Sequence, residues 1–163
     1  LAGLSFDNLA ARIAPEMRID IEPTWVVGKF RARYPKAAPL DLFHHIVTAA
    51  RSWRGQVEEA EARARAGHPG FVYQLDFGQG KHADDIALGF GTIPDPAPAQ
   101  QAMSDRVMDA FVRFARTGDP GWPAYDLTKR PTITFDTTSR VEGDPRKWER
   151  ELFARVPYIQ PGS

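Results

Sequence analysis

The stretch that decides the fold is FVYQLDF at residues 71–77, followed after a short glycine-rich loop by HADDIALGFG at residues 82–91. The first segment is an aromatic and β-branched run bounded by glycines, which is typical of a strand. The second opens with His82, and two aspartates then precede an apolar stretch that predicts a helical turn through Phe90. A histidine in a loop directly after a strand suits the base of a hydrolytic triad. This stretch therefore indicates both a fold class and a chemistry.

The elements around this stretch are mostly helices. Apolar periodicity and the placement of prolines and glycines predict helices over residues 5–13, 24–34, 40–66, 99–116 and 146–153, with Ser5 or Asp7 capping the first and Asp144 the last. Further strands are expected at residues 131–136 and 140–142. So few strands, flanked by long helices, do not make an independent sheet of ordinary size. We therefore predict an α/β fold whose strands close a larger sheet that lies mostly elsewhere.

Two of the predicted helices have faces that the sequence assigns. The first half of residues 40–66 places apolar side chains at helical spacing and predicts a buried stripe. The second half pairs Glu59 with Arg63 and Glu61 with Arg65, which predicts a solvated surface before Gly67 ends the helix. The helix over residues 99–116 is expected to face inward with Met103, Val107, Met108, Ala110, Phe111 and Phe114.

Composition limits the classes of function. The chain has 163 residues, 42% of them hydrophobic, which is enough for one sizeable core. It carries 21 basic and 21 acidic residues, so no overall field favours nucleic acid or a membrane surface. The lack of cysteine excludes thiolate catalysis and cysteine-ligated metals. No apolar run approaches the roughly 20 residues that span a bilayer, so no membrane span is expected. The cellular compartment is left open.

His82 is the first candidate for chemistry. Histidine changes its charge near neutral pH, and in a triad one ring nitrogen takes the serine proton while a carboxylate holds the other. The alternative is a surface-loop histidine hydrogen-bonded to a neighbouring aspartate. Asp84 and Asp85 lie where carboxylates cap a helix. Asp85, three residues after His82, would also lie near it on a helical turn, where its charge favours the protonated imidazole.

The other parts of a hydrolase site are missing from the sequence. Gly-x-Ser-x-Gly does not occur around any of the serines, which are Ser5, Ser52, Ser104, Ser139 and Ser163. His44 and His45 are adjacent on a predicted helix and point about 100° apart, so they do not share one metal ion easily. No glycine-rich phosphate loop is present. We therefore expect no metal, no cofactor and no nucleic-acid partner.

Five segments occur in a fixed order along the chain. They are residues 71–77, residues 82–91, residues 103–120, WPAYD at 122–126 and TITFD at 132–136. In that order they resemble the strand vYmYrFd, the segment HgxEipfvFg, the helix and turn mxxxWxxFArtGdPn, and the motifs WPxYd and tmxFd of the type-B carboxylesterases. That family comprises bacterial p-nitrobenzyl esterases, animal carboxylesterases and cholinesterases. Each motif is weak alone, and the five in order are specific.

This resemblance implies the C-terminal part of an α/β hydrolase that cleaves small-molecule carboxylic esters through an acyl-enzyme. Residues 1–163 would belong to a single catalytic domain, with a helical, cap-like region at 1–67 and the histidine loop, last strands and helices at 68–163. His82 matches the catalytic histidine, and Asp85 matches an acidic residue near the active centre that is more often glutamate. The nucleophile, the triad acid and the oxyanion-hole glycines would lie upstream of Leu1, in a missing N-terminal part. The chain alone is therefore expected to be inactive.

Two other functions stay open on the sequence. Cholinesterase-like adhesion proteins keep the fold without the triad, so this chain could be part of a non-catalytic binding module. An upstream segment without a serine elbow would favour that alternative. The second alternative is that the chain is a self-contained helical α/β domain. In that case we expect the 163 residues to unfold cooperatively on their own.

Overall fold

The computed structural model describes residues 1–78, 80 and 83–159, and it divides into two compact units. One unit joins residues 1–59 to residues 146–163, and the other is residues 60–145. The prediction that residues 1–163 belong to one domain, with a helical region at 1–67, stays a prediction.

The unit formed by the two ends of the chain is helical. Its helices are α1 (Leu9–Ile13), a 3-10 turn (Ala14–Glu16), α2 (Pro23–Arg33), α3 (Pro39–Val47), a π-helical segment (Thr48–Trp53), the start of α4 (Arg54–Arg65) and α7 (Lys147–Phe153). Proline occupies the first position of α2 and of α3, where the missing N–H costs nothing. The Glu22 side chain accepts from Thr24 N at 2.9 Å and also from Trp25 N, and so caps α2.

The core of this unit brings the two ends of the chain together. Phe30 of α2 is fully buried and packs on Phe153 and Trp148 of α7, with ring centroids 6.1 and 4.9 Å away. The other fully buried side chains include Leu9, Ile13, Val26, Leu42 and Ile46. The buried stripe predicted for the first half of residues 40–66 is confirmed, because Leu42, Phe43, Ile46, Ala50 and Trp53 are all buried.

The predicted caps of the first and last helices are wrong. Asn8, rather than Ser5 or Asp7, occupies the position before α1, and its side chain accepts from Ser5 N at 2.9 Å instead of from the helix. The residue before α7 is Arg146, with no side-chain cap, whereas Asp144 lies outside the helix with φ at 52°. Neither helix has a side-chain hydrogen bond from its N-cap residue to its first turn.

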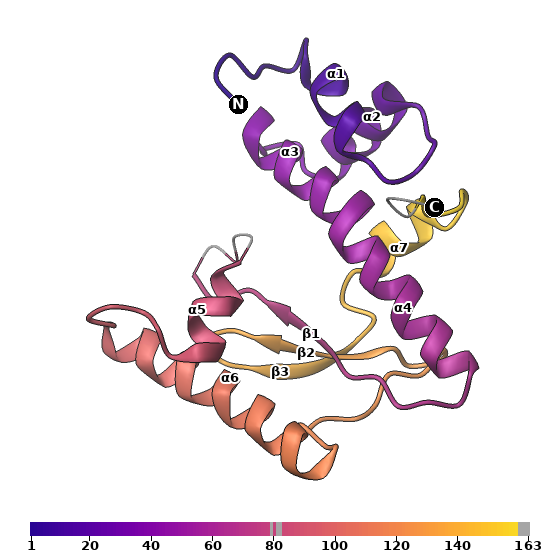
Figure 1. Ribbon diagram of the computed structural model, residues 1–163. Coiled ribbons are helices and arrows are strands. Elements are labelled where there is room, and N and C mark those ends of the chain that lie inside the picture. The colour runs from indigo at the N-terminus through magenta and orange to yellow at the C-terminus, as the bar shows by residue number, and fades with distance from the viewer. Residues whose placement is uncertain (79, 81–82, 160–163) are drawn as a thin grey trace. The chain divides into compact units, whose positions relative to one another are not determined.

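The second unit contains a three-stranded mixed sheet (Figure 1). Strand β1 (Val72–Leu75) pairs in parallel with β2 (Pro131–Phe135), and β2 pairs antiparallel with β3 (Arg140–Gly143). A parallel pair needs a long crossover, and here it contains α5 (Asp84–Phe90) and α6 (Pro98–Thr117). The three strands confirm the positions predicted from the sequence, and Figure 1 shows α6 running along the sheet.

The packing of α5 on α6 fixes the start of the crossover. Ser104 of α6 is buried and donates its hydroxyl to Leu88 O of α5 at 2.7 Å. Met103, Val107 and Ala110 are buried as predicted. Phe111 and Phe114 were predicted to face inward, but they are 38% and 50% exposed. Each ring is partly exposed but still contacts another aromatic ring: Phe111 contacts Tyr73 of β1, and Phe114 contacts Phe71, the residue before β1.

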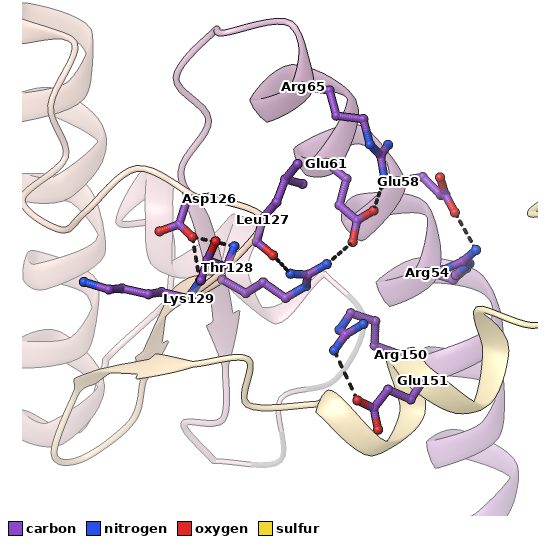
Figure 2. Close-up of polar contacts among 11 residues, drawn as sticks. Arg54, Glu58, Glu61, Arg65, Asp126, Leu127, Thr128, Lys129, Arg150 and Glu151 are labelled. Atoms are coloured by element: carbon purple, nitrogen blue, oxygen red, sulfur yellow. Dashed lines mark hydrogen bonds and ion pairs between the residues drawn. The ribbon is translucent and has the colours of Figure 1, made fainter.

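The second half of α4 is less solvated than predicted. The pair of Glu61 with Arg65 is confirmed, but the Glu61 side chain is only 14% exposed because Arg130 also binds it. Arg130 donates to Glu61 Oε1 at 2.9 Å and to Leu127 O, while Asp126 accepts from Thr128 N and Lys129 N (Figure 2). Arg63 donates to Pro69 O. The turn before β2 is therefore tied to α4 by charge-assisted hydrogen bonds.

Candidate active-site frame

The predicted catalytic histidine, His82, lies outside the described residues, together with positions 79 and 81. The structure does describe the segments on both sides of it: the end of β1, Gly80, and α5 with the residue before it. These segments form the frame of the candidate site. Their geometry shows which side chains are held in the two elements that flank residue 82.

The end of β1 is fastened to β2 just before the loop. The backbone N–H groups of Asp76 and Phe77 both donate to Phe135 O, at 2.9 and 3.0 Å. Gly80 has φ at +53°, and a Cβ at that position would lie 2.4 Å from Leu75 O. Only glycine accommodates both the left-handed backbone and the close approach. Gly80 therefore lies close against the backbone at the end of β1.

The other side of the loop ends in a second left-handed residue. Ala83 has φ at 71°, which is uncommon for a residue with a Cβ, and α5 begins at the next residue. Asp84 and Asp85 therefore lie in the first turn of α5 and do not occupy the cap position that was predicted for them. Carboxylates in a first turn interact favourably with the helix dipole, which explains why both are tolerated there.

Asp85 is held by a residue that sequence reasoning did not identify. The hydroxyl of Tyr73 in β1 donates to Asp85 Oδ2 at 2.8 Å. The Tyr73 ring packs against Phe111 of α6 and Phe135 of β2, each with centroids 5.9 Å apart. Burial, followed by the hydrogen bond and the negative charge of Asp85, raises the pKa of Tyr73 to about 12. This phenol therefore stays neutral, and a donor, across the physiological range.

The described serines do not form a nucleophile elbow, in keeping with the sequence. Ser104 is buried against Leu88 O. Ser139 Oγ accepts from Arg106 and donates to Asp136 O in the turn before β3. Ser5 bonds Asn8 through its backbone N–H. Near residue 82, the described part of the chain holds a carboxylate, that of Asp85, in the first turn of α5.

His45 and His68 make contacts that belong to the packing and backbone hydrogen bonding of the fold. The His45 ring stacks on Tyr34, with centroids 4.9 Å apart and planes at 6°, and burial followed by the charge of Arg146 lowers its pKa. His68 N donates to Arg63 O just after α4. Among the described residues, no group of three or more histidine, aspartate or glutamate side chains is arranged to hold a metal ion. Within the same residues no helix is long and apolar enough to cross a membrane.

Comparison with known proteins finds similarity to esterases. No family model matches the chain. The chain is 26% identical to the para-nitrobenzyl esterase of Bacillus subtilis (strain 168) over 138 residues, which is 72% of this chain and 28% of that protein. Among solved structures, the Geobacillus stearothermophilus carboxylesterase EST55 is 28% identical, with a TM-score of 0.61 over 67% of this chain and 27% of its own. A PNB esterase structure matches 91% of this chain and 33% of its own, at 23% identity and a TM-score of 0.68.

The fold is that of the C-terminal part of an α/β hydrolase, as the sequence predicted: two PNB esterase structures match 91% of this chain and 33% of their own, with TM-scores of 0.68 and 0.67. Within that class, the resemblance to the type-B carboxylesterases is confirmed by similarity to the para-nitrobenzyl esterase and to EST55. The chain spans about 28% of the length of its curated relative. Its relatives are therefore considerably longer proteins.

Proposed function

We propose that this chain is the C-terminal part of a carboxylic ester hydrolase and supplies its catalytic histidine, His82. The observation that carries the proposal is the similarity to para-nitrobenzyl esterase over 72% of the chain, combined with a histidine in the segment that resembles the family's histidine motif. A carboxylate three residues later, held by Tyr73, supports the assignment.

The proposed chemistry is acyl transfer through a serine ester. A serine in the upstream part of the protein attacks the ester carbonyl while an imidazole nitrogen of His82 takes its proton. His82 then returns this proton to the leaving alcohol, and water hydrolyses the acyl-enzyme by the reverse sequence. Upstream backbone amides bind the oxyanion. The negative charge of Asp85 favours the imidazolium that forms in each step.

The first experiment removes the proposed base. In the complete protein that contains this chain, His82→Ala should lower kcat for a p-nitrophenyl ester by at least about a thousandfold, because a triad member acts as part of a unit. His68→Ala is the matched control, since His68 lies at the end of α4 in a backbone hydrogen bond and should leave kcat near the wild-type value. Retention of more than a few per cent of kcat by His82→Ala would refute the assignment.

The coding sequence upstream of Leu1 provides an independent test. The esterase proposal expects a Gly-x-Ser-x-Gly elbow and an aspartate or glutamate a short distance before Leu1. It also expects no esterase activity from residues 1–163 alone, because no described serine lies in an elbow. An elbow without serine would instead favour the non-catalytic binding module on the same scaffold.

A further inference from the structure

An indole and two cations follow one side of α2. Trp25, Lys29 and Arg33 are spaced four residues apart, so they lie in one row along the helix surface. Lys29 Nζ lies 5.3 Å from the centroid of the Trp25 ring. Lys29 and Arg33 are exposed, whereas Trp25 is half-buried. The row therefore presents its positive charges to the solvent and keeps its indole beneath them.

Residues from the other end of the chain extend this row. Arg33 Cζ lies 6.0 Å from the centroid of Trp148 in α7, and Cζ of the exposed Arg155, two residues after α7, lies 5.5 Å from the centroid of Trp25. The end of α2 thus meets the start of α7, and the two helices run antiparallel. We call Trp25, Lys29, Arg33, Trp148 and Arg155 the cation–indole strip. Each of its cations lies over an indole at a distance typical of cation–π interactions.

The three cations of the strip lie over rings rather than against carboxylates. Among the residues that the structure describes, no carboxylate forms an ion pair with Lys29, Arg33 or Arg155. A guanidinium over a ring keeps the N–H donors in its own plane available to an oxyanion. The strip therefore carries charges that no described carboxylate neutralises.

The carboxylates closest to the strip in sequence are engaged in other contacts. Glu22 accepts two backbone N–H groups at the start of α2. Glu149 is buried and accepts from the Tyr34 hydroxyl at 3.2 Å. Glu151 lies 3.8 Å from Lys147. These contacts hold the three carboxylates to partners outside the strip.

The two segments that form the strip are locally basic. Residues 22–36 hold four basic residues and one acidic residue, and residues 146–155 hold four basic and two acidic residues. The whole chain carries 21 residues of each sign. The strip therefore lies in a region of positive charge on a chain whose net charge is zero.

This positive surface is narrow. Arg31 is two residues from Lys29, hence about 200° around α2, and it lies over a different ring, that of Phe6, at 4.4 Å. Polybasic surfaces that bind anionic membranes gather about four to eight lysines or arginines, whereas this strip has three. Tryptophan and arginine are enriched at the centres of protein–protein interfaces. The composition and the width of the strip therefore favour a protein partner over a lipid surface.

We propose that the cation–indole strip binds an extended acidic segment of a partner protein. Lys29 and Arg33 are about 6 Å apart along the helix axis, because four residues rise about 1.5 Å each. In an extended chain, side chains on the same face recur about every 6.7 Å. Carboxylates at alternate positions of such a segment face Lys29 and Arg33 together, and Arg155 lies beside Lys29 at the same indole.

The test measures the anisotropy of fluorescent peptides mixed with the complete protein that contains this chain. The probe is a peptide in which glutamate alternates with serine, and its comparison has glutamine in place of every glutamate. The glutamate peptide should bind more tightly than the glutamine peptide, and its affinity should fall as salt is added, because exposed charges are screened. Replacing the three cations together, Lys29→Gln, Arg33→Gln and Arg155→Gln, should lower the affinity at least about tenfold.

The matched control removes the same charge from the other unit. Arg106→Gln, Arg116→Gln and Lys129→Gln together replace three exposed cations there, and they should change the affinity by less than about twofold. Lys29→Arg keeps the charge and should bind the glutamate peptide like the wild type. All variants should unfold thermally near the wild-type temperature, because the substituted positions are exposed.

Three results would overturn the proposal. The first is that the glutamate peptide does not bind the complete protein, or binds no better than the glutamine peptide. The second is that the two triple variants lose affinity equally. The third is that vesicles of phosphatidylcholine with phosphatidylserine bind through the strip whereas the glutamate peptide does not, which would assign this surface to a membrane. None of these results depends on the proposed ester hydrolysis, because binding alone is measured.

Discussion

Replacing Gly80 by alanine tests how closely this residue approaches the backbone of β1. Gly80 has φ at +53°, and an added Cβ would lie 2.4 Å from the carbonyl oxygen of Leu75. That oxygen belongs to the backbone at the end of a hydrogen-bonded strand, so it cannot rotate away as a side chain would. Gly78, in the same loop, provides the comparison, because its φ is +69° and nothing lies within 4 Å of its added Cβ.

The two substitutions share one energetic cost and differ in a second. The left-handed backbone costs an alanine about 1–2 kcal/mol at either position. At Gly80 the contact with Leu75 O adds the cost of forcing an atom into a packed region, about 1–3 kcal/mol. We therefore expect Gly80→Ala to destabilise the loop by about 2–5 kcal/mol and Gly78→Ala by about 1–2 kcal/mol.

Amide hydrogen exchange in the complete protein measures this locally. The N–H groups of Asp76 and Phe77, which donate to Phe135 O, report the opening of the loop from the strand end. Since a factor of ten corresponds to about 1.4 kcal/mol, their protection should fall by about thirtyfold or more in Gly80→Ala and by about five- to thirtyfold in Gly78→Ala. Equal losses in the two variants would refute the close approach of Gly80 to β1.

Two further predictions follow from the described contacts. A double-mutant cycle with Glu61→Gln and Arg130→Gln should give a coupling free energy of about 1–2 kcal/mol in urea denaturation, because these side chains are only 14% and 16% exposed. The control cycle with Lys147→Gln and Glu151→Gln should give less than about 0.5 kcal/mol, because those side chains are 67% and 56% exposed. Similar coupling free energies in the two cycles would contradict this expectation. For Tyr73, whose pKa rises from 10.0 to about 12 on folding, the protonated form is favoured in the folded state, so its contribution to stability is complete below pH 10 and is lost as the pH rises toward 12. Ultraviolet titration should show the Tyr73 phenolate forming near pH 12, and Tyr73→Phe should lack this step and the alkaline loss of stability that accompanies it.

The order of helices and strands was predictable because it depends on residue types and spacings within each short segment. The aromatic and β-branched run at residues 71–77 contains β1, and the prolines before residues 24 and 40 mark the starts of α2 and α3. The stripe in the first half of residues 40–66 is buried because its apolar spacing matches the helical period, and the spacing persists through a π-helical segment. These features need no knowledge of what the chain contacts elsewhere.

The features that the sequence did not predict depend on contacts between distant segments. Tyr73 and Asp85 are 12 positions apart, on a strand and a helix, so no helical or strand period brings them together. Glu61 was placed on a solvated face, and it is mostly buried because Arg130, far along the chain, covers it. For Tyr73 the one available signal was a phenol flanked by apolar side chains in the run at residues 71–77, since a partly buried phenol usually requires a partner. The role of His82 stays a prediction.

The discontinuous helical unit has a consequence for how the protein is made. Its core contains Phe30 from the first segment and Phe153 from the last, and the whole of the sheet-bearing unit is encoded between them. On a ribosome that adds about 5–20 residues per second, the early helices wait several seconds or more for α7 to be synthesised. During that interval the apolar faces of α2 and α3 have no C-terminal partner. Slowing translation between residues 60 and 145 should therefore increase the demand of the nascent chain for chaperones.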